Sequence, residues 1–192
     1  MNDGKQSQPK KNRVTDSELL ERVRDSDAEA FRTLFDQYQP LVFRHVLYQT
    51  RDVDLAHDIV QESFLRIWER RASLKPHLSF VAYLFRISGN LVRDDIKHRN
   101  VQRKLEHAIP PPTPSEGDDP EEALRMATLK RELVNAVNVS LPEKCRTIFL
   151  LSRMEGKSNK QIAELLGIAT KTVENQIHHA LKVLRKRLRG HV

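Results

Sequence analysis

Cysteine and long apolar runs are scarce in this chain of 192 residues. The single cysteine, Cys145, cannot form a disulfide within the chain, which favours a reducing compartment. No apolar run approaches the ~20 residues of a membrane-spanning helix, and the polar segment 1–12 has no signal-peptide core. We therefore expect a cytoplasmic protein without membrane insertion, with Cys145 acting as a small buried hydrophobe.

Residue patterns for catalysis or metal binding are also lacking. The eight histidines do not occur with cysteines or carboxylates at metal-ligand spacing. His178 and His179 are adjacent, so they point to different sides of a helix. With six glycines, the chain has no glycine-rich loop to hold a phosphate. The sequence therefore predicts a protein that is not an enzyme, with no metal, no cofactor and no catalytic residue.

Positive charge is in excess. Lysine and arginine number 33 against 26 aspartate and glutamate residues, which gives a net charge of +7 and a pI of about 9.7. Such a balance favours polyanionic partners, because binding them releases counterions. Nucleic acid is therefore the favoured class of partner.

Proline is concentrated in one acidic segment, residues 106–120, which contains five of the nine prolines and no lysine or arginine. Such a composition is typical of an extended linker. The chain on either side shows helical periodicity and no sheet pattern. We expect an all-α fold of two small helical domains, residues 15–105 and 121–192, after a disordered tail, residues 1–14.

The helix starts have recognisable signals. Thr15 and Glu18 fit a capping box, and Asp27 fits the cap of a second helix. Pro40 suits the first turn of a third helix. In the second domain, we expect a first helix that begins near residue 121 and contains four apolar residues: Leu124, Leu129, Leu133 and Val137.

Residues 51–71 predict an amphipathic helix whose apolar side faces the core. Its other side is acidic and partly apolar, and it carries Asp58, Gln61, Glu62 and Leu65. Such a face suits a protein partner with basic residues. Spacing alone favours the alternative, an ordinary solvated face.

Residues 78–100 predict a second helix with a polar, basic stripe. The stripe contains Arg86, Asn90, Arg93, Lys97 and His98. It lies beside the aromatic residues Phe80 and Tyr83, and cations next to aromatic rings suit single-stranded nucleic acid. The alternative is that the aromatic rings belong to the core.

Residues 158–180 have the pattern of a helix-turn-helix, in which Gly167 ends the first helix, Ile168 fills the space under the turn and Thr170 caps the second helix. The second helix of this motif enters the DNA major groove. The residues that we expect to contact DNA are Lys171, Thr172, Glu174, Asn175, His178, Lys182, Arg185 and Lys186. An ordinary helical hairpin with a basic end is the alternative.

Three blocks together resemble the extracytoplasmic-function (ECF) group of bacterial sigma factors in the sigma-70 family. The blocks are residues 58–68, residues 80–94 with Asn90, and Leu141-Pro142 followed by the helix-turn-helix to Leu184. The resemblance covers residues 15–190. One departure is Gly89, where relatives often carry an arginine.

The resemblance implies a sigma factor that binds RNA polymerase core and directs it to promoters. The helix containing residues 58–68 would dock on a coiled coil of the largest polymerase subunit. Residues 80–99 would hold the melted minus-ten strand, with Asn90 near a flipped base. The last domain would read the minus-thirty-five element and contact the polymerase flap. An anti-sigma factor is a further candidate partner.

Two other functions are open from the residues alone. A stand-alone DNA-binding repressor or activator would bind duplex DNA without polymerase. An enzyme that processes RNA or DNA would need a metal or nucleophile, and no residue pattern supports one.

Overall fold

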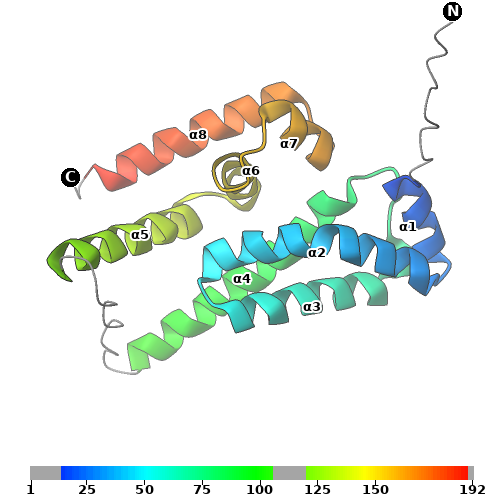
Figure 1. Ribbon diagram of the computed structural model, residues 1–192, viewed down its shortest axis with the longest axis horizontal. Coiled ribbons are helices and arrows are strands. Elements are labelled where there is room, and N and C mark those ends of the chain that lie inside the picture. The colour runs from blue at the N-terminus through cyan, green and yellow to red at the C-terminus, as the bar shows by residue number, and fades with distance from the viewer. Residues whose placement is uncertain (1–13, 106–119, 190–192) are drawn as a thin grey trace, which may run out of the picture.

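A computed structural model describes residues 14–105 and 120–189, and every regular element in these two ranges is a helix (Figure 1). The predicted all-α fold with a helix-turn-helix is therefore confirmed. The predicted tail and linker, apart from Val14 and Pro120, lie outside the described residues. The helices are α1 Asp16–Arg24, α2 Ala28–Thr50, α3 Val53–Glu69, η1 Arg71–Ser73, α4 Phe80–Leu105, α5 Pro120–Ser140, α6 Glu143–Arg153, α7 Asn159–Leu166 and α8 Thr170–Leu188.

The predicted caps of the first two helices are present. The Thr15 hydroxyl accepts a hydrogen bond from the Glu18 amide, and the Glu18 carboxylate accepts one from the Thr15 amide. The Asp27 carboxylate accepts from the amides of Glu29 and Ala30. These bonds satisfy amides that the first helical turn leaves unpaired.

The prediction that Pro40 starts a separate helix is wrong. Pro40 lies inside α2, which runs without a break over 23 residues. Proline removes one backbone hydrogen bond, but its fixed φ is compatible with a helix. Tyr38 and Val42, on either side of it, are both buried, so packing against the neighbouring helices stabilises the continuous helix.

The helices α1–α4 form an N-terminal unit, in which α2, α3 and α4 pack against one another (Figure 1). Buried side chains recur at helical spacing along each helix. Among them are Leu34, Val42, Val46, Ile59, Val60, Phe64, Ile67, Phe80, Leu84 and Phe85. This core holds α3 and α4 with their polar faces outward.

The helices α5–α8 form a C-terminal unit with a second apolar cluster. Cys145 is buried there, as predicted, and its thiol donates to the Gln176 carbonyl oxygen at 3.4 Å. Burial raises the pKa of this thiol. Val137 also lies in this cluster.

The predicted first helix of this unit, which contains Leu124, Leu129, Leu133 and Val137, is present as α5. Leu129 is 49% exposed and Leu133 is 37% exposed. Among the described side chains of α5, only Ala136 and Val137 are buried, near the end of the helix. Leu124 lies outside the residues whose side chains are described. The middle of α5 therefore presents an apolar edge.

The two units pack directly on each other. Buried residues of α6 and α7 lie in the same apolar cluster as α2 and α4: Ile148, Leu151, Ile162, Ala163 and Leu166. Helix α6 contacts both α2 and α4, and α7 contacts α4. Among the described helices, none is long and apolar enough to cross a membrane.

Candidate nucleic-acid and polymerase interfaces

The helix-turn-helix consists of α7, a short turn and α8. Ser158 caps α7 in a reciprocal capping box with Gln161. Gly167 ends α7 with φ of +64°, in the left-handed region that glycine enters without strain, as predicted. Ile168 is half-buried against the core under this turn.

The predicted cap of α8 is wrong by one residue. Ala169 is the N-cap, and no side chain caps this helix. The backbone of Ala169 is extended, and its carbonyl oxygen accepts from the amides of Thr172 and Val173. Thr170 is therefore already the first residue of the helix, where its hydroxyl is not positioned to cap.

Helix α8 is amphipathic along its length. Val173, Ala180 and Leu184 are buried on one side. Seven of the predicted DNA-contacting side chains are exposed on the other side: Lys171, Glu174, Asn175, His178, Lys182, Arg185 and Lys186. The eighth, Thr172, is half-buried. Lys171 and Glu174 form an ion pair at 3.2 Å, so the first turn presents a paired charge.

The predicted stripe on α4 is divided between exposed and contacted residues. Arg86, Asn90, Lys97 and His98 are exposed. The fifth residue, Arg93, is half-buried, and its guanidinium donates to Asn90 Oδ1 at 3.1 Å and to Glu143 Oε2 at 2.8 Å. Since Glu143 begins α6, part of this stripe lies against the C-terminal unit.

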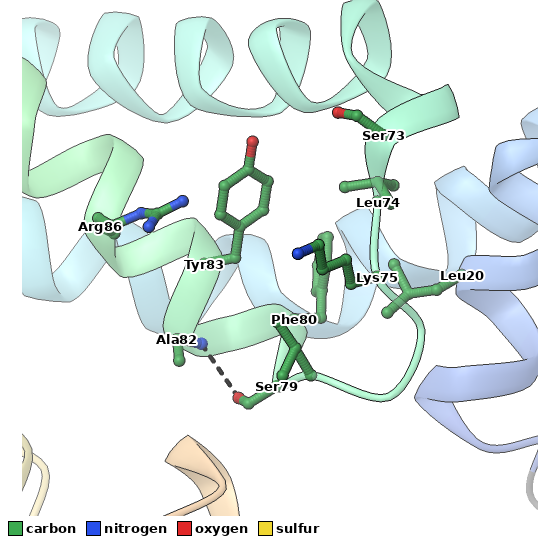
Figure 2. Close-up of a pocket in the computed structure, with 10 residues that line it drawn as sticks. Leu20, Ser73, Leu74, Lys75, Ser79, Phe80, Ala82, Tyr83 and Arg86 are labelled. Carbon is green, nitrogen blue, oxygen red and sulfur yellow. Dashed lines mark hydrogen bonds between the residues drawn. The ribbon is translucent and has the colours of Figure 1, made fainter.

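A cavity of about 530 Å³ opens at the first turns of α4 (Figure 2). The Arg86 guanidinium lies 5.0 Å from the centre of the Tyr83 ring, and both side chains line the cavity. Of the predicted stripe, only Arg86 reaches it; Asn90, Arg93, Lys97 and His98 lie farther along the helix. Phe80 is buried and forms part of the wall.

Sequence reasoning missed the loop that forms the other side of this cavity. Ser73, Leu74 and Lys75 line it from the loop between α3 and α4, and Leu20 reaches it from α1 (Figure 2). The available signal was a lysine beside Pro76, just before the aromatic start of α4. Lys75 is exposed, so it adds a cation to the opening.

The outward face of α3 has the predicted composition. Asp58 and Gln61 are exposed, and Leu65 is 52% exposed. Glu62 accepts a hydrogen bond from Arg66 at 2.6 Å one turn along the helix. The face is therefore acidic with a solvent-exposed leucine. Within the described ranges, no group of histidine, cysteine and carboxylate side chains could hold a metal ion.

Comparison with known proteins places these features in one family. The family description "Sigma-70 region 2" matches residues 34–101, and "Sigma-70, region 4" matches residues 132–184. The chain is 28% identical over 178 residues to the ECF RNA polymerase sigma factor SigW of Bacillus subtilis, covering 88% of this chain and 95% of SigW. It is 30% identical over 173 residues to the RNA polymerase sigma factor CarQ of Myxococcus xanthus, and the match covers 88% of this chain and 95% of CarQ.

A solved structure, CnrH in complex with the cytosolic domain of CnrY, has a similar fold, with a TM-score of 0.56 and 22% identity over 92% of this chain and 99% of that chain. The predicted family resemblance is therefore confirmed. The chain belongs to the ECF group of the sigma-70 family, whose members direct RNA polymerase to promoters.

Proposed function

We propose that the two helical units divide the promoter contacts of this sigma factor. Residues 15–105 bind polymerase core and the melted minus-ten strand, and residues 121–192 read the minus-thirty-five duplex. The two family matches support this division, because each falls within one unit. The chain acts by binding in the cytoplasm, and the polymerase performs nucleotide transfer.

Duplex recognition is assigned to α8. Asn175 reads adenine edges, Lys171 guanine edges and Glu174 the cytosine amino group, in the pairings that the major groove allows. Lys182, Arg185 and Lys186 hold phosphates. The exposure of all these side chains opposite the buried Val173 and Ala180 supports this assignment.

Two further surfaces are assigned to the polymerase. The acidic face of α3, with Asp58 and Leu65, docks on the coiled coil of the largest subunit. The flap docks in an apolar groove of about 810 Å³ between α2, α5 and α6, beside the exposed Leu133 and Met154. Partly exposed apolar side chains in a groove are typical of a docking surface. An anti-sigma factor is a candidate competitor there.

The cavity beside Tyr83 and Arg86 is the proposed binding site for an unpaired base of the melted strand. A half-exposed ring with a guanidinium stacked on it provides a surface on which an unpaired base can stack. Unstacking a base costs a few kcal/mol, which stacking and edge hydrogen bonds in a pocket must return. Asn90, whose amide both donates and accepts, lies one turn beyond Arg86.

Reconstitution with purified polymerase core tests the function. We expect promoter-specific transcription only when both the core and this chain are present, and weak binding of the free chain to duplex DNA. A Tyr83→Ala variant should lose most of this transcription, whereas the matched Tyr83→Phe variant, which keeps the ring, should retain it. Tight and specific duplex binding without polymerase would instead identify a stand-alone regulator.

A further inference from the structure

Two cavities of different character meet beside α5. The apolar groove of about 810 Å³ between α2, α5 and α6 has walls that include Leu47, Val137 and Leu150. A second cavity of about 500 Å³ lies between α2, α4 and α5, and most of its lining residues are polar. Gln49 and Val134 line both cavities, so together they form one groove with an apolar end and a polar end.

Gln49 carries an acceptor without a donor at the junction of the two cavities. It is 4% exposed, and its amide nitrogen donates to the His45 carbonyl oxygen at 3.2 Å. This bond fixes the orientation of the amide, because the reversed amide would bring two carbonyl oxygens together. Its Oε1 is buried and has no hydrogen-bond partner among the described residues. A buried acceptor of this kind favours a ligand that donates an N–H.

Asn138 carries a second such acceptor at the polar end. Its amide nitrogen donates to the Gln49 carbonyl oxygen at 2.9 Å, which fixes this amide in the same way. Its Oδ1 is also buried and, in the part of the chain that the structure describes, unpaired. Folded proteins rarely leave such acceptors unsatisfied, and here two occur on the contacting helices α2 and α5. The polar end is therefore suited to a donor group.

Positive charge is in excess at the polar end. Three guanidinium groups line this cavity, against the two carboxylates of Asp95 and Glu132. Arg99 already holds Asp95 at 2.9 Å and Asp52 at 3.1 Å. Arg131, by contrast, is exposed on α5. This balance favours an anionic group on the ligand at Arg131, because a guanidinium binds a carboxylate through paired hydrogen bonds.

The apolar end is open to solvent. Tyr48 is 38% exposed, Leu133 is 37% exposed and Met154 is 40% exposed, and all three line the groove. No carboxylate of the described residues lines it. Its volume is in the range of cavities that hold small molecules. An acyl chain in this groove would cover the three side chains and remove their apolar surface from water.

We propose that the groove binds a small amphipathic acid, in which an apolar chain is joined to a carboxylate through an N–H group. N-acylated amino acids have this chemistry. The chain lies in the apolar groove, the N–H lies between Gln49 Oε1 and Asn138 Oδ1, and the carboxylate contacts Arg131. The bound acid competes with the polymerase flap for the apolar groove. This competition rests on the proposed docking of the flap, whereas binding of the acid does not.

Three compounds with the same chain length separate the parts of the ligand. N-dodecanoylglycine has the chain, the N–H and the carboxylate. N-dodecanoylsarcosine has an N-methyl group in place of the N–H, and the methyl ester of N-dodecanoylglycine has no charge. Binding to the full chain is measured by isothermal titration calorimetry below the micelle concentration of each compound.

We expect N-dodecanoylglycine to bind about fivefold more tightly than the N-methyl compound and about tenfold more tightly than the ester, because each comparison removes one polar contact. Equal affinities for all three compounds would show adsorption to an apolar surface only and would overturn the proposal.

Variants locate the site in the groove. Met154→Glu places a charge in the apolar end, and Arg131→Gln removes the cation at the polar end. Each should weaken binding of N-dodecanoylglycine by about tenfold. The matched controls, Met126→Glu and Arg125→Gln, change exposed residues of α5 that do not line either cavity, and they should bind like the original protein. Equal losses in variants and controls would contradict the assigned site.

Gln49→Met tests the acceptor itself. Methionine is flexible and fills a similar volume without the oxygen, so this variant should still bind the N-methyl compound but lose the preference for the N–H compound. Thermal unfolding without ligand verifies that the variant is folded. A fivefold preference that persists in Gln49→Met would overturn the role of this acceptor.

Transcription by the reconstituted holoenzyme separates the ligand site from flap docking. N-dodecanoylglycine should inhibit promoter transcription with the original protein, and about tenfold more of it should be needed with Arg131→Gln. Binding of the acid without any inhibition would support the ligand site and count against flap docking in the same groove. Equal inhibition of the two proteins would show an effect on the polymerase and contradict the competition.

Discussion

Arg44 and Glu155 form a bidentate ion pair that joins the two helical units. Arg44 Nη2 lies 2.8 Å from Glu155 Oε2, and Arg44 Nε lies 2.9 Å from Oε1. The Glu155 side chain is 11% exposed, and its carboxylate raises the pKa of Arg44. Two parallel hydrogen bonds fix direction as well as distance, so this pair orients α2 relative to the end of α6.

A double-mutant cycle measures the strength of this pair. Arg44→Ala, Glu155→Ala and the double variant should show a coupling of about 1 kcal/mol in the free energy of unfolding, because Arg44 is half exposed and water screens the pair. Arg44→Lys should lose most of the coupling, since lysine cannot form the two-point contact. Urea denaturation provides the measurement, and a coupling indistinguishable from zero would contradict the structural role assigned to the pair.

His45 makes stability depend on pH. It is 2% exposed and packs against Phe85, and burial together with Arg146 lowers its pKa to about 3. In the unfolded chain its pKa is near 6.5, so the neutral form contributes stability above that pH, and the contribution is lost as the pH falls from about 6.5 toward 3. Within this window, the free energy of unfolding falls by about 1.4 kcal/mol for each unit by which the pH is lowered.

Replacing His45 with glutamine removes this titration. We expect the stability of His45→Gln to fall less than that of the original protein between pH 6.5 and 4. Asp27 and Asp52, whose pKa values are lowered by backbone hydrogen bonds, titrate in both proteins and cancel in the comparison. Parallel profiles from chemical denaturation across this range would show that His45 does not cause the dependence.

The acidic face of α3 is tested by charge reversal. Asp58→Lys with Glu62→Lys should weaken binding to polymerase core, because the substitutions reverse the charge presented to a basic partner. Glu21→Lys with Asp36→Lys makes the same change in net charge at exposed positions away from this face. Core affinity is measured by pull-down titration, with helical content followed by circular dichroism. Equal losses in the two double variants would indicate a nonspecific charge effect.

The division of roles along α8 predicts two distinct kinds of loss. Asn175→Ala should weaken the free energy of DNA binding by about 1–3 kcal/mol and relax the preference for one base at a single base pair. Lys186→Ala should weaken binding to all sequences alike and reduce the salt slope by about one. Lys144→Ala, an exposed lysine on α6, should do neither. Holoenzyme binding to promoters with single substitutions distinguishes these outcomes, and identical profiles for Asn175→Ala and Lys186→Ala would refute the division.

Local signals predicted much of this fold. Capping residues such as Thr15 and Asp27, and the left-handed position of Gly167, act through neighbouring backbone groups, so the sequence is sufficient to identify them. Pro40 was misjudged because packing on both sides holds one long helix together. The exposure of Leu129 could not be predicted, because helical spacing gives no information on whether another helix covers a face.

The polar faces of α3, α4 and α8 were also predictable, because hydrophobic periodicity fixes which side of a helix turns outward. The contacts between the units were not. Arg93 and Glu143 are 50 residues apart, and Arg44 and Glu155 are 111 apart. Pairing over such separations depends on how the units dock, and no local pattern encodes it.

Promoter opening tests the central claim, that α4 captures a single strand, most directly. Permanganate footprinting of unpaired thymines should show little opening of a duplex promoter by holoenzyme carrying Tyr83→Ala or Asn90→Ala, although both variants bind polymerase core normally. A promoter with a pre-melted bubble should restore much of the transcription, because the cost of unstacking has then been removed. Full opening of the duplex promoter by both variants would contradict the account.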